Sequence, residues 1–332
     1  MAAVLIDTFG RTAVDLRVSL TDRCNLRCTY CMPEEGLQWL TKPQLLTDEE
    51  IVRLVRVAVT VLGVTQVRFT GGEPLLRPGL VGIVAACAAL EPRPGLSLTT
   101  NGVGLAGTAA ALAGAGLDRV NVSLDTLDPD TFHTLTRRHR HQDVLDGLAA
   151  AEAAGLRPVK VNTVLMRGVN DEEAPDLLAW CLERGYELRF IEQMPLDPQH
   201  GWDRTSMITA EEILARLVTR FTLTPEPTAR RGAAPAERWL VDGGPAKVGV
   251  IASVTRPFCR SCDRTRLTAD GQVRNCLFAR EETDLRTALR DGADDAKIAE
   301  LWRAAMWGKK AGAGIDNPEF LQPDRPMSAI GG

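Results

Sequence analysis

The chain has 332 residues, of which 45% are hydrophobic and 25% are charged, and its formal net charge is −4 at pH 7. This length suits about two domains with a sizeable buried core, which excludes a wholly disordered chain. The slightly acidic balance argues against non-specific nucleic-acid binding, which depends on a positive field, so an anionic ligand must be held by a local basic cluster.

The first residues reach Asp7 after only a few apolar positions, too short a run for a secretory signal. The longest apolar run, residues 80–90, is too short to cross a bilayer. We therefore expect a cytoplasmic protein that binds neither membrane nor nucleic acid. In a reducing cytoplasm its eight cysteines are expected as metal ligands or small buried side chains, and six of them fall into two groups of three.

Short β-rich runs alternate with helical stretches through the first two-thirds of the chain, a pattern typical of parallel βα units. The expected strands are residues 15–20, 66–70, 96–99, 119–124, 158–164 and 187–192. Six units are fewer than the eight of a closed TIM barrel. We therefore predict an α/β fold built as a partial (β/α)6 barrel with an open side.

Helix starts between these strands have recognisable capping residues. Thr47 with Glu50, and Thr209 with Glu212, fit capping boxes in which each side chain satisfies the other residue's free backbone N–H. Asp128 is an expected N-cap because a proline follows it at the first helical position. These signals place helices after the loops that follow the strands.

The composition changes after Thr222. Pro225, Pro227 and the Gly/Pro/Ala-rich residues 232–236 indicate a loop, and residues 237–241 and 247–251 read as two further short strands. We predict a barrel domain over residues 1–222 and a C-terminal domain over residues 223–332 that covers the open side of the barrel.

The first cysteine group, Cys24, Cys28 and Cys31, has the spacing C-x3-C-x2-C directly after the first expected strand. A structural zinc site normally has four ligands, and no histidine lies nearby in the sequence. A [4Fe–4S] cluster held by three cysteines leaves one iron free for a small molecule. A zinc site and inert packing remain the alternatives for this segment.

This spacing resembles the radical S-adenosylmethionine (SAM) superfamily. The resemblance implies that the free iron binds the amino and carboxylate groups of SAM and that an electron passed through the cluster releases a 5'-deoxyadenosyl radical. Tyr30 matches a position near the adenine, although a partly buried loop aromatic explains it equally well. Thr70-Gly-Gly-Glu-Pro74 resembles the motif whose backbone holds the methionyl amino group, which assigns Gly72 and Glu73 to SAM; a tight turn is the plain alternative.

Polar residues follow the other expected strands as well, and the carboxyl ends of parallel barrel strands open on one face, where active sites are built. Ser123 and Met194 match SAM contacts of the family named below. Without that match, a strand-end cap and a core methionine would be the preferred readings.

The second cysteine group, Cys259, Cys262 and Cys276, has the spacing C-x2-C-x13-C. A zinc ribbon would need another cysteine close to Cys276, so a second [4Fe–4S] cluster with an open iron is favoured. Cys87 and Cys181 lie among apolar helical residues, and core packing is expected for both.

Basic residues surround this second group. Residues 256–280 contain six arginines and two aspartates. A solvated charge run is the usual explanation, but arginines placed between metal ligands lie near a site, and their planar forks suit phosphate. A polyanionic small molecule is therefore the expected substrate.

At this point the resemblance narrows to the GTP 3',8-cyclases, the A proteins of molybdenum cofactor biosynthesis. It rests on Phe-Cys-x2-Cys-Asp-Arg-x-Arg-Leu-Thr-x-Asp-Gly, starting at Phe258, and on the later Cys-Leu-Phe, and it extends over nearly the whole chain to the terminal Met-Ser-Ala-Ile-Gly-Gly. By this resemblance the residues that contact GTP are Arg17, Arg68, Thr99, Lys160, Arg264, Thr265 and Arg266. Taken singly, each fits a surface charge or a strand-edge residue.

The same resemblance implies that the terminal Gly331 and Gly332 reach into the active site, although a frayed terminus is the ordinary reading. Together with the first three cysteines, Arg264 and Arg266, these glycines form the expected catalytic set. The implied reaction begins when the radical removes the hydrogen at C3' of the GTP ribose. The carbon radical then attacks C8 of guanine, and reduction yields 3',8-cyclo-7,8-dihydro-GTP, while the second cluster binds the guanine edge.

The implied partners are GTP, SAM, an electron donor, the cyclic pyranopterin monophosphate synthase that accepts the product, and a second copy of the chain in a homodimer. Two rival functions remain open. One is another radical SAM enzyme with an auxiliary cluster, such as a peptide-modifying enzyme, and the other is a non-catalytic zinc- or iron-binding module that binds RNA through its basic segment.

Overall fold

The computed structural model describes residues 4–227, 231–315, 317 and 320–331. Its centre is a curved sheet to which six parallel strands contribute in chain order, each paired with the next. These strands are β1 (Asp15–Ser19), β2 (Gln66–Thr70), β3 (Gly95–Thr100), β4 (Arg119–Ser123), β5 (Lys160–Val164) and β6 (Glu187–Ile191). All six coincide with expected strands to within two residues at each end, which confirms the predicted run of βα units.

The C-terminal part of the chain adds strands to both edges of this sheet. Beside β6 lie β9 (Lys247–Ile251), β8 (Glu237–Val241) and β7 (Leu223–Pro225), and beside β1 lie β10 (Arg264–Leu267), β11 (Gln272–Arg274) and β12 (Thr283–Asp284). The pairs β6–β9 and β1–β10 are parallel, whereas the outer pairs are antiparallel. The C-terminal residues therefore continue the barrel sheet in both directions, so that eight of its strands run parallel.

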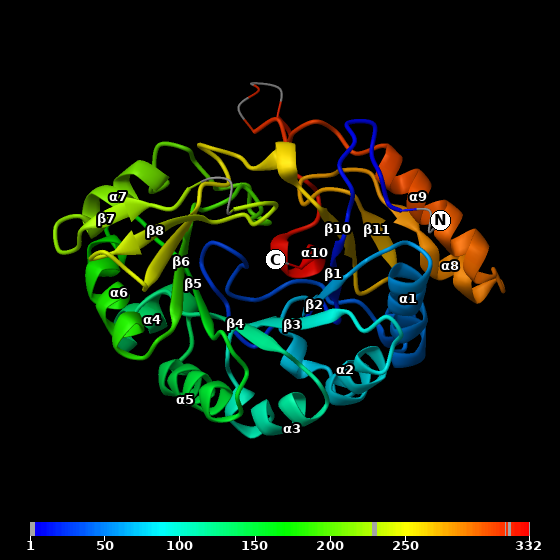
Figure 1. The fold of residues 1–332 in the computed structure, drawn as a ribbon, viewed down its shortest axis with the longest axis horizontal. Helices are drawn as coiled ribbons and strands as arrows, with labels where there is room; N and C mark the ends of the chain where they lie inside the picture. Colours follow the sequence, from blue (N-terminus) through cyan, green and yellow to red (C-terminus); the bar gives the residue numbers. More distant parts are fainter. Residues whose placement is uncertain (1–3, 228–230, 316, 318–319, 332) are drawn as a thin grey trace.

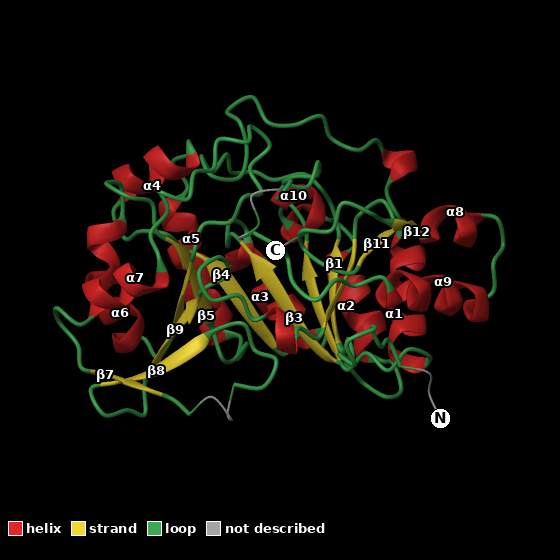
Figure 2. Ribbon diagram, turned by 90° about the horizontal axis from the view of Figure 1, so that it is seen from above, coloured by secondary structure: helices red, strands yellow, loops and turns green. Residues whose placement is uncertain are grey.

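Most helices pack on the outside of the curve, as Figure 1 shows for α1, α2, α3, α5 and α6. The bounds are α1 (Asp48–Thr60), α2 (Leu80–Ala88), α3 (Ala109–Gly114), α4 (Pro129–Thr136), α5 (His141–Ala153), α6 (Ala174–Glu183), α7 (Ala210–Leu217), α8 (Leu285–Arg290), α9 (Asp295–Trp307) and α10 (Met327–Ile330). Helix α10 differs from the others, because it lies inside the curve of the strands together with the C-terminus (Figures 1 and 2).

The capping signals in the sequence mark real helix starts. The Thr47 hydroxyl accepts a hydrogen bond from the backbone N–H of Glu50, and the Glu50 carboxylate accepts one from the N–H of Thr47. Thr209 and Glu212 form the same box ahead of α7, and Asp128 caps α4. Each box satisfies backbone N–H groups that the first helical turn leaves free.

The hydrophobic core fills the space between the sheet and the outer helices. On β2, Val67 and Phe69 are fully buried on this side, so Arg68 between them points to the inside of the curve. Cys87 and Cys181 are fully buried in the same core, which confirms their predicted packing role. No helix in the described residues is both long and apolar enough to cross a membrane.

Candidate active site

The first cysteine group lies in the loop after β1 and lines a cavity of about 180 Å3. All three thiols, of Cys24, Cys28 and Cys31, face it. The other walls come from the carboxyl ends of the neighbouring strands and include Thr70, Gly71 and Gly72 after β2, Thr99, Thr100 and Asn101 at β3, and Ser123 and Asp125 at β4. The structure thus brings the first cysteine group, Tyr30, Gly72 and Ser123 to one cavity, together with Thr99, which the family resemblance assigns to GTP.

The two glycines after β2 lie directly beneath the cysteine loop. The N–H of Gly72 donates to the carbonyl of Thr21, and the N–H of Glu73 donates to the carbonyl of Arg23, both at 2.7 Å. A Cβ on Gly72 would lie 2.2 Å from the Arg23 carbonyl oxygen, and one on Gly71 would lie 2.4 Å from that of Thr21. Only glycine permits this approach, so the pair sets how closely the cysteine loop packs against the end of β2.

Glu73 is fully buried and holds the next loop in place instead of lining the cavity. Its carboxylate accepts hydrogen bonds from the N–H of Leu75, the hydroxyl of Thr100 and the N–H of Asn101. Burial raises the pKa of this carboxyl to about 7, and the three hydrogen bonds oppose that shift. Asn101 in turn places its amide nitrogen 3.6 Å from the Cys24 sulfur, so Glu73 acts on the cysteine site through Asn101.

The Tyr30 side chain contacts the buried carboxyl group of Asp125 in the wall of the cavity. Its hydroxyl donates to Asp125 at 2.7 Å, and the other Asp125 oxygen accepts from the N–H of Val164 at 2.9 Å. Burial raises the pKa of Asp125 to about 6, although both hydrogen bonds lower it. This contact joins the cysteine loop to the ends of β4 and β5.

The Asp125 carboxyl makes stability depend on pH. Its folded pKa is raised, so its stabilising contribution is present below about pH 4 and is lost as the pH rises to about 6. Asp125→Asn keeps an oxygen for Val164 and an N–H for the Tyr30 oxygen. We expect the variant to gain unfolding free energy relative to the wild type between about pH 4 and 6 and to keep a constant lead above that range. Denaturant unfolding across this range measures the difference, and a difference that does not change with pH would contradict the assignment.

The thiols of the first group have raised pKa values. Burial is the main cause for Cys24, Cys28 and Cys31, and it brings the pKa of Cys31 to about 12 despite a hydrogen bond from the Ser328 backbone. Thiolates at this site therefore need a strong positive charge beside them, which iron ions supply. The donor set is the one that an iron–sulfur cluster requires.

The second cysteine group lines a separate cavity of about 80 Å3. Cys259, Cys262 and Cys276 all face this cavity, and Arg264 and Arg266 of β10 form part of its wall. Within the described part of the chain, no group of three or more His, Cys, Asp or Glu side chains is arranged to hold a single metal ion. An iron–sulfur cluster is bound differently, because each thiolate takes its own iron atom.

Lys309 is a residue of this second site that the sequence did not reveal. The residue is 4% exposed, and its ammonium lies 3.3 Å from the Cys262 sulfur and donates to the Arg264 carbonyl at 2.8 Å. Burial raises the pKa of Cys262, but Lys309 and Arg264 together lower it below its usual value. Charges of the protein itself therefore favour the thiolate form of Cys262.

Met194 also lines this second cavity, although the sequence assigned it to SAM. It follows β6 in a loop that a buried carboxylate, Glu192, fixes in place. Glu192 accepts hydrogen bonds from the N–H groups of Ala210, Val254 and Thr255. It thereby ties the start of α7 to the segment that leads to the second cysteine group.

Basic side chains of three adjacent strands stand side by side inside the barrel. In the parallel register, Arg17 of β1 lies opposite Arg68 of β2 on one side and Arg266 of β10 on the other. Burial and, as a smaller cause, repulsion from Arg17 lower the pKa of Arg266 to about 9. The same two causes lower the pKa of Arg68. Guanidinium groups that repel one another in a buried space form a site for a polyanion.

Several of these guanidinium groups have unused donors. The Nε atoms of Arg17, Arg68 and Arg189 are buried without a hydrogen-bond partner. Buried donors are normally paired, so a bound anion would complete them. Arg189 and Arg119, whose charges also act on Arg68, join the predicted residues of this basic layer.

The other two predicted GTP contacts lie at different positions. Lys160, at the start of β5, forms an ion pair with Glu187 at 2.5 Å and shares a cavity of about 290 Å3 with Arg189. The Thr265 hydroxyl accepts a hydrogen bond from Trp302 of α9 at 2.9 Å, on the face opposite Arg264 and Arg266. A contact between Thr265 and the nucleotide would therefore have to come from its backbone.

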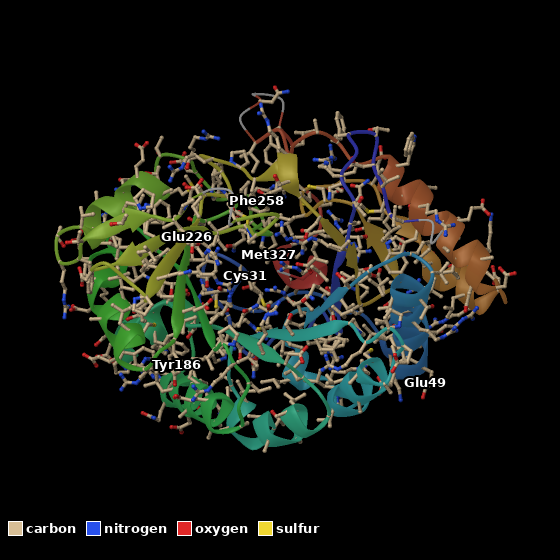
Figure 3. The ribbon with its side chains drawn as sticks, viewed as in Figure 1. Cys31, Glu49, Tyr186, Glu226, Phe258 and Met327 are labelled. Carbon is tan, nitrogen blue, oxygen red and sulfur yellow. The ribbon has the colours of Figure 1, made fainter. Side chains whose placement is uncertain are left out.

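The C-terminal tail runs between the two cavities. Met327 and Ser328 line the first cavity, and Figure 3 shows Met327 close to Cys31 at the centre of the molecule. The Ser19 hydroxyl donates to the Ile330 carbonyl at 2.9 Å, and Arg266, in the wall of the second cavity, donates to the Gly331 carbonyl. Gly331 has a φ of +80°. A Cβ there would lie 2.4 Å from the Ser19 hydroxyl oxygen, so glycine is required. Gly332, also expected in the active site, lies outside the described residues.

Comparisons with known proteins agree with this organisation. Two family models match the chain, the radical SAM superfamily over residues 18–181 and the C-terminal domain of molybdenum cofactor synthesis over residues 186–315. The chain is 76% identical to the GTP 3',8-cyclase of Streptomyces coelicolor, covering 100% of this chain and 97% of that one. It is 64% identical to GTP 3',8-cyclase 2 of Mycobacterium tuberculosis, covering 99% of this chain and 92% of the relative.

Solved structures show the same fold at low sequence identity. SuiB of Streptococcus suis bound to S-adenosylmethionine superposes with a TM-score of 0.60 at 15% identity, covering 88% of this chain and 64% of SuiB. The anSMEcpe protein with bound AdoMet superposes with a TM-score of 0.50 at 17% identity, covering 62% of this chain and 57% of that protein. At this identity the likeness concerns the fold alone.

Proposed function

The chain belongs to the GTP 3',8-cyclase family of radical SAM enzymes, and on that premise we propose that its two cysteine groups hold the family's two [4Fe–4S] clusters on either side of the C-terminal tail. The family converts GTP to (8S)-3',8-cyclo-7,8-dihydroguanosine 5'-triphosphate, the first step of molybdenum cofactor biosynthesis, and uses SAM. The observation that carries the proposal is that each cysteine trio lines its own cavity and that the tail contacts both.

We assign the first cavity to SAM. When bound there, SAM and the cluster supply the radical that removes hydrogen from C3' of the ribose. The chain's own part is positioning. Gly71 and Gly72 set how closely the cysteine loop packs against the end of β2, and Tyr30 and Ser123 line the wall of the cavity. The predicted contact of Met194 with SAM stays a prediction, because Met194 lines the second cavity.

We assign the basic layer to the triphosphate of GTP. The orphaned Nε donors of Arg17, Arg68 and Arg189 supply hydrogen bonds, and the surrounding positive charges gain most from an anion of high charge. Arg264 and Arg266 link this layer to the second cavity, which supports our assignment of the guanine to the side of Cys259, Cys262 and Cys276. No side chain has to act as a general base, since radical chemistry depends on positioning and exclusion of water.

The two parts of the chain have different roles in this proposal. We propose that residues 1–222 carry the SAM chemistry and that residues 223–332 carry the second cluster, much of the GTP site and the tail. An electron donor, the cyclic pyranopterin monophosphate synthase as product acceptor, a homodimer and a cytoplasmic location complete the proposal.

Anaerobic reconstitution tests this function. We expect about eight iron atoms per chain, corresponding to two [4Fe–4S] clusters, and formation of 5'-deoxyadenosine that depends on GTP. The cyclised nucleotide should appear in step with 5'-deoxyadenosine. Equal amounts of 5'-deoxyadenosine with and without GTP, or zinc in place of iron, would contradict the proposal.

A further inference from the structure

The tail is held by one strong ionic anchor before it enters the space between the cysteine sites. Both terminal nitrogens of Arg325 donate to the Asp270 carboxylate, at 2.9 and 2.7 Å, and one of them also lies 2.9 Å from Glu282. The Asp270 side chain is 10% exposed and that of Glu282 is 18% exposed, so these contacts are shielded from solvent. A two-pronged, partly buried ion pair of this kind is much stronger than a surface pair.

Both carboxylates are also held in place by residues other than Arg325. The Thr268 hydroxyl donates to Asp270 at 2.6 Å, and the buried Arg274 forms an ion pair with Glu282. Asp270 lies in the turn after β10, and Glu282 lies just before β12. The receptor therefore belongs to the sheet extension that also carries Arg264 and Arg266.

Beyond Arg325 the tail makes few hydrogen bonds to the rest of the protein, although the Ile330 side chain is fully buried. The N–H of Met327 donates to the Leu196 carbonyl at 3.2 Å, and the carbonyls of Ile330 and Gly331 accept from Ser19 and Arg266. Single hydrogen bonds of this kind are offset by the entropy lost when several residues are ordered. The ion pair of Arg325 therefore adds a substantial part of the free energy that holds these residues in place, beside the burial of Ile330.

We propose that Arg325 is a positioning residue, which docks the C-terminal tail between the two cysteine sites by binding Asp270 and Glu282. A docked tail closes the first cavity with Met327 and Ser328 and holds Gly331 against Arg266. The use of this closure in turnover rests on the proposed function, whereas the docking itself does not. Without the anchor, the tail leaves its site more often and water enters the first cavity.

Hydrogen exchange of the C-terminal peptide, measured on the anaerobic holoenzyme, tests the docking directly. The N–H groups of Ala329 and Gly331 are hydrogen-bonded within the tail and report its order. In Arg325→Gln we expect their exchange to be at least about ten-fold faster than in the wild type. Arg325→Lys, which keeps the charge but loses the fork, should fall between the two. Arg280→Gln is the matched control, because Arg280 makes an exposed ion pair with the tail residue Asp324 at 3.9 Å.

Turnover gives a second readout. Arg325→Gln should raise the ratio of 5'-deoxyadenosine to cyclised nucleotide, because an open site loses the radical before it reaches GTP, and Arg280→Gln should not. Unchanged exchange in Arg325→Gln, or an equal increase in the Arg280 control, would overturn the proposal. A wild-type enzyme that forms no cyclised nucleotide would contradict the proposed function alone, since the exchange result is independent of turnover.

Discussion

Gly72→Ala is expected to remove the first cluster while leaving the second in place. The added Cβ would lie 2.2 Å from the carbonyl oxygen of Arg23 and 2.5 Å from that of Asp22. Both oxygens belong to the backbone, so the clash cannot be relieved by a side-chain rotation. The cysteine loop has to move away, and the hydrogen bonds from Gly72 and Glu73 to that loop lengthen with it.

The consequence for chemistry is large because the loop carries three ligands and one wall of the SAM cavity. We expect bound iron to fall to about half, or about four atoms per chain, and SAM cleavage to fall by at least about 100-fold. Iron and sulfide analysis and 5'-deoxyadenosine formation measure the two effects. Gly82→Ala is the control: Gly82 is exposed on α2 with no atom near the new Cβ, and alanine there should stabilise the helix by about 1 kcal/mol. Full iron content and normal SAM cleavage in Gly72→Ala would show that the close approach has no role.

Local signals in the sequence were sufficient for β1 to β6, for β8 and β9, and for the starts of α1, α4 and α7. β2 has buried Val67 and Phe69 on one face, and capping boxes such as Thr47 with Glu50 act within a few residues. The edges of the sheet could not be predicted in the same way. Whether β9 pairs with β6 and β10 with β1 depends on contacts between residues far apart in the chain, which a strand's own pattern does not specify.

The same distinction between local signals and long-range contacts applies to the residues of the site. Cysteine spacing predicted two metal-ligand groups, and each group of three lines a cavity of its own in the structure. Arg119 and Arg189 were missed because a single basic residue in a short strand is normally interpreted as a surface charge. The curvature of the sheet, which turns such a residue to the inside of the barrel, is not visible in the sequence. The alternation of Arg189 with buried Leu188 and Phe190 was the available signal. The same alternation places the Thr265 side chain on the face opposite its two arginine neighbours. No sequence pattern indicated Lys309, because only the fold places it beside Cys262.

Arg17→Met is expected to uncouple stability from GTP binding. Arg17 is buried, its Nε has no hydrogen-bond partner, and it lies between Arg68 and Arg266 in the sheet register. Burial lowers its pKa, repulsion from Arg264 adds to that, and attraction to Asp15 opposes it. The Asp15 carboxylate lies 3.5 Å from the Arg17 Nε and offsets part of the cost of burying this charge, but it is shared with Arg68, Arg264 and Arg266. Methionine fills similar space without the charge, and Asp15 keeps Arg68, Arg264 and Arg266 near it, so the nucleotide-free variant should lose little in unfolding temperature.

With GTP the two proteins should differ clearly. Losing one partner of a buried, charge-assisted contact costs about 2–5 kcal/mol, so GTP affinity should fall by roughly 100-fold or more. The increase in unfolding temperature that GTP produces should largely disappear, since that increase follows from binding to the folded state. Lys297→Met on the exposed surface of α9 makes the same change in net charge and should alter neither quantity. If Arg17→Met kept the full stabilisation by GTP, the triphosphate could not lie against the basic layer, and the nucleotide would have to be placed elsewhere in the barrel.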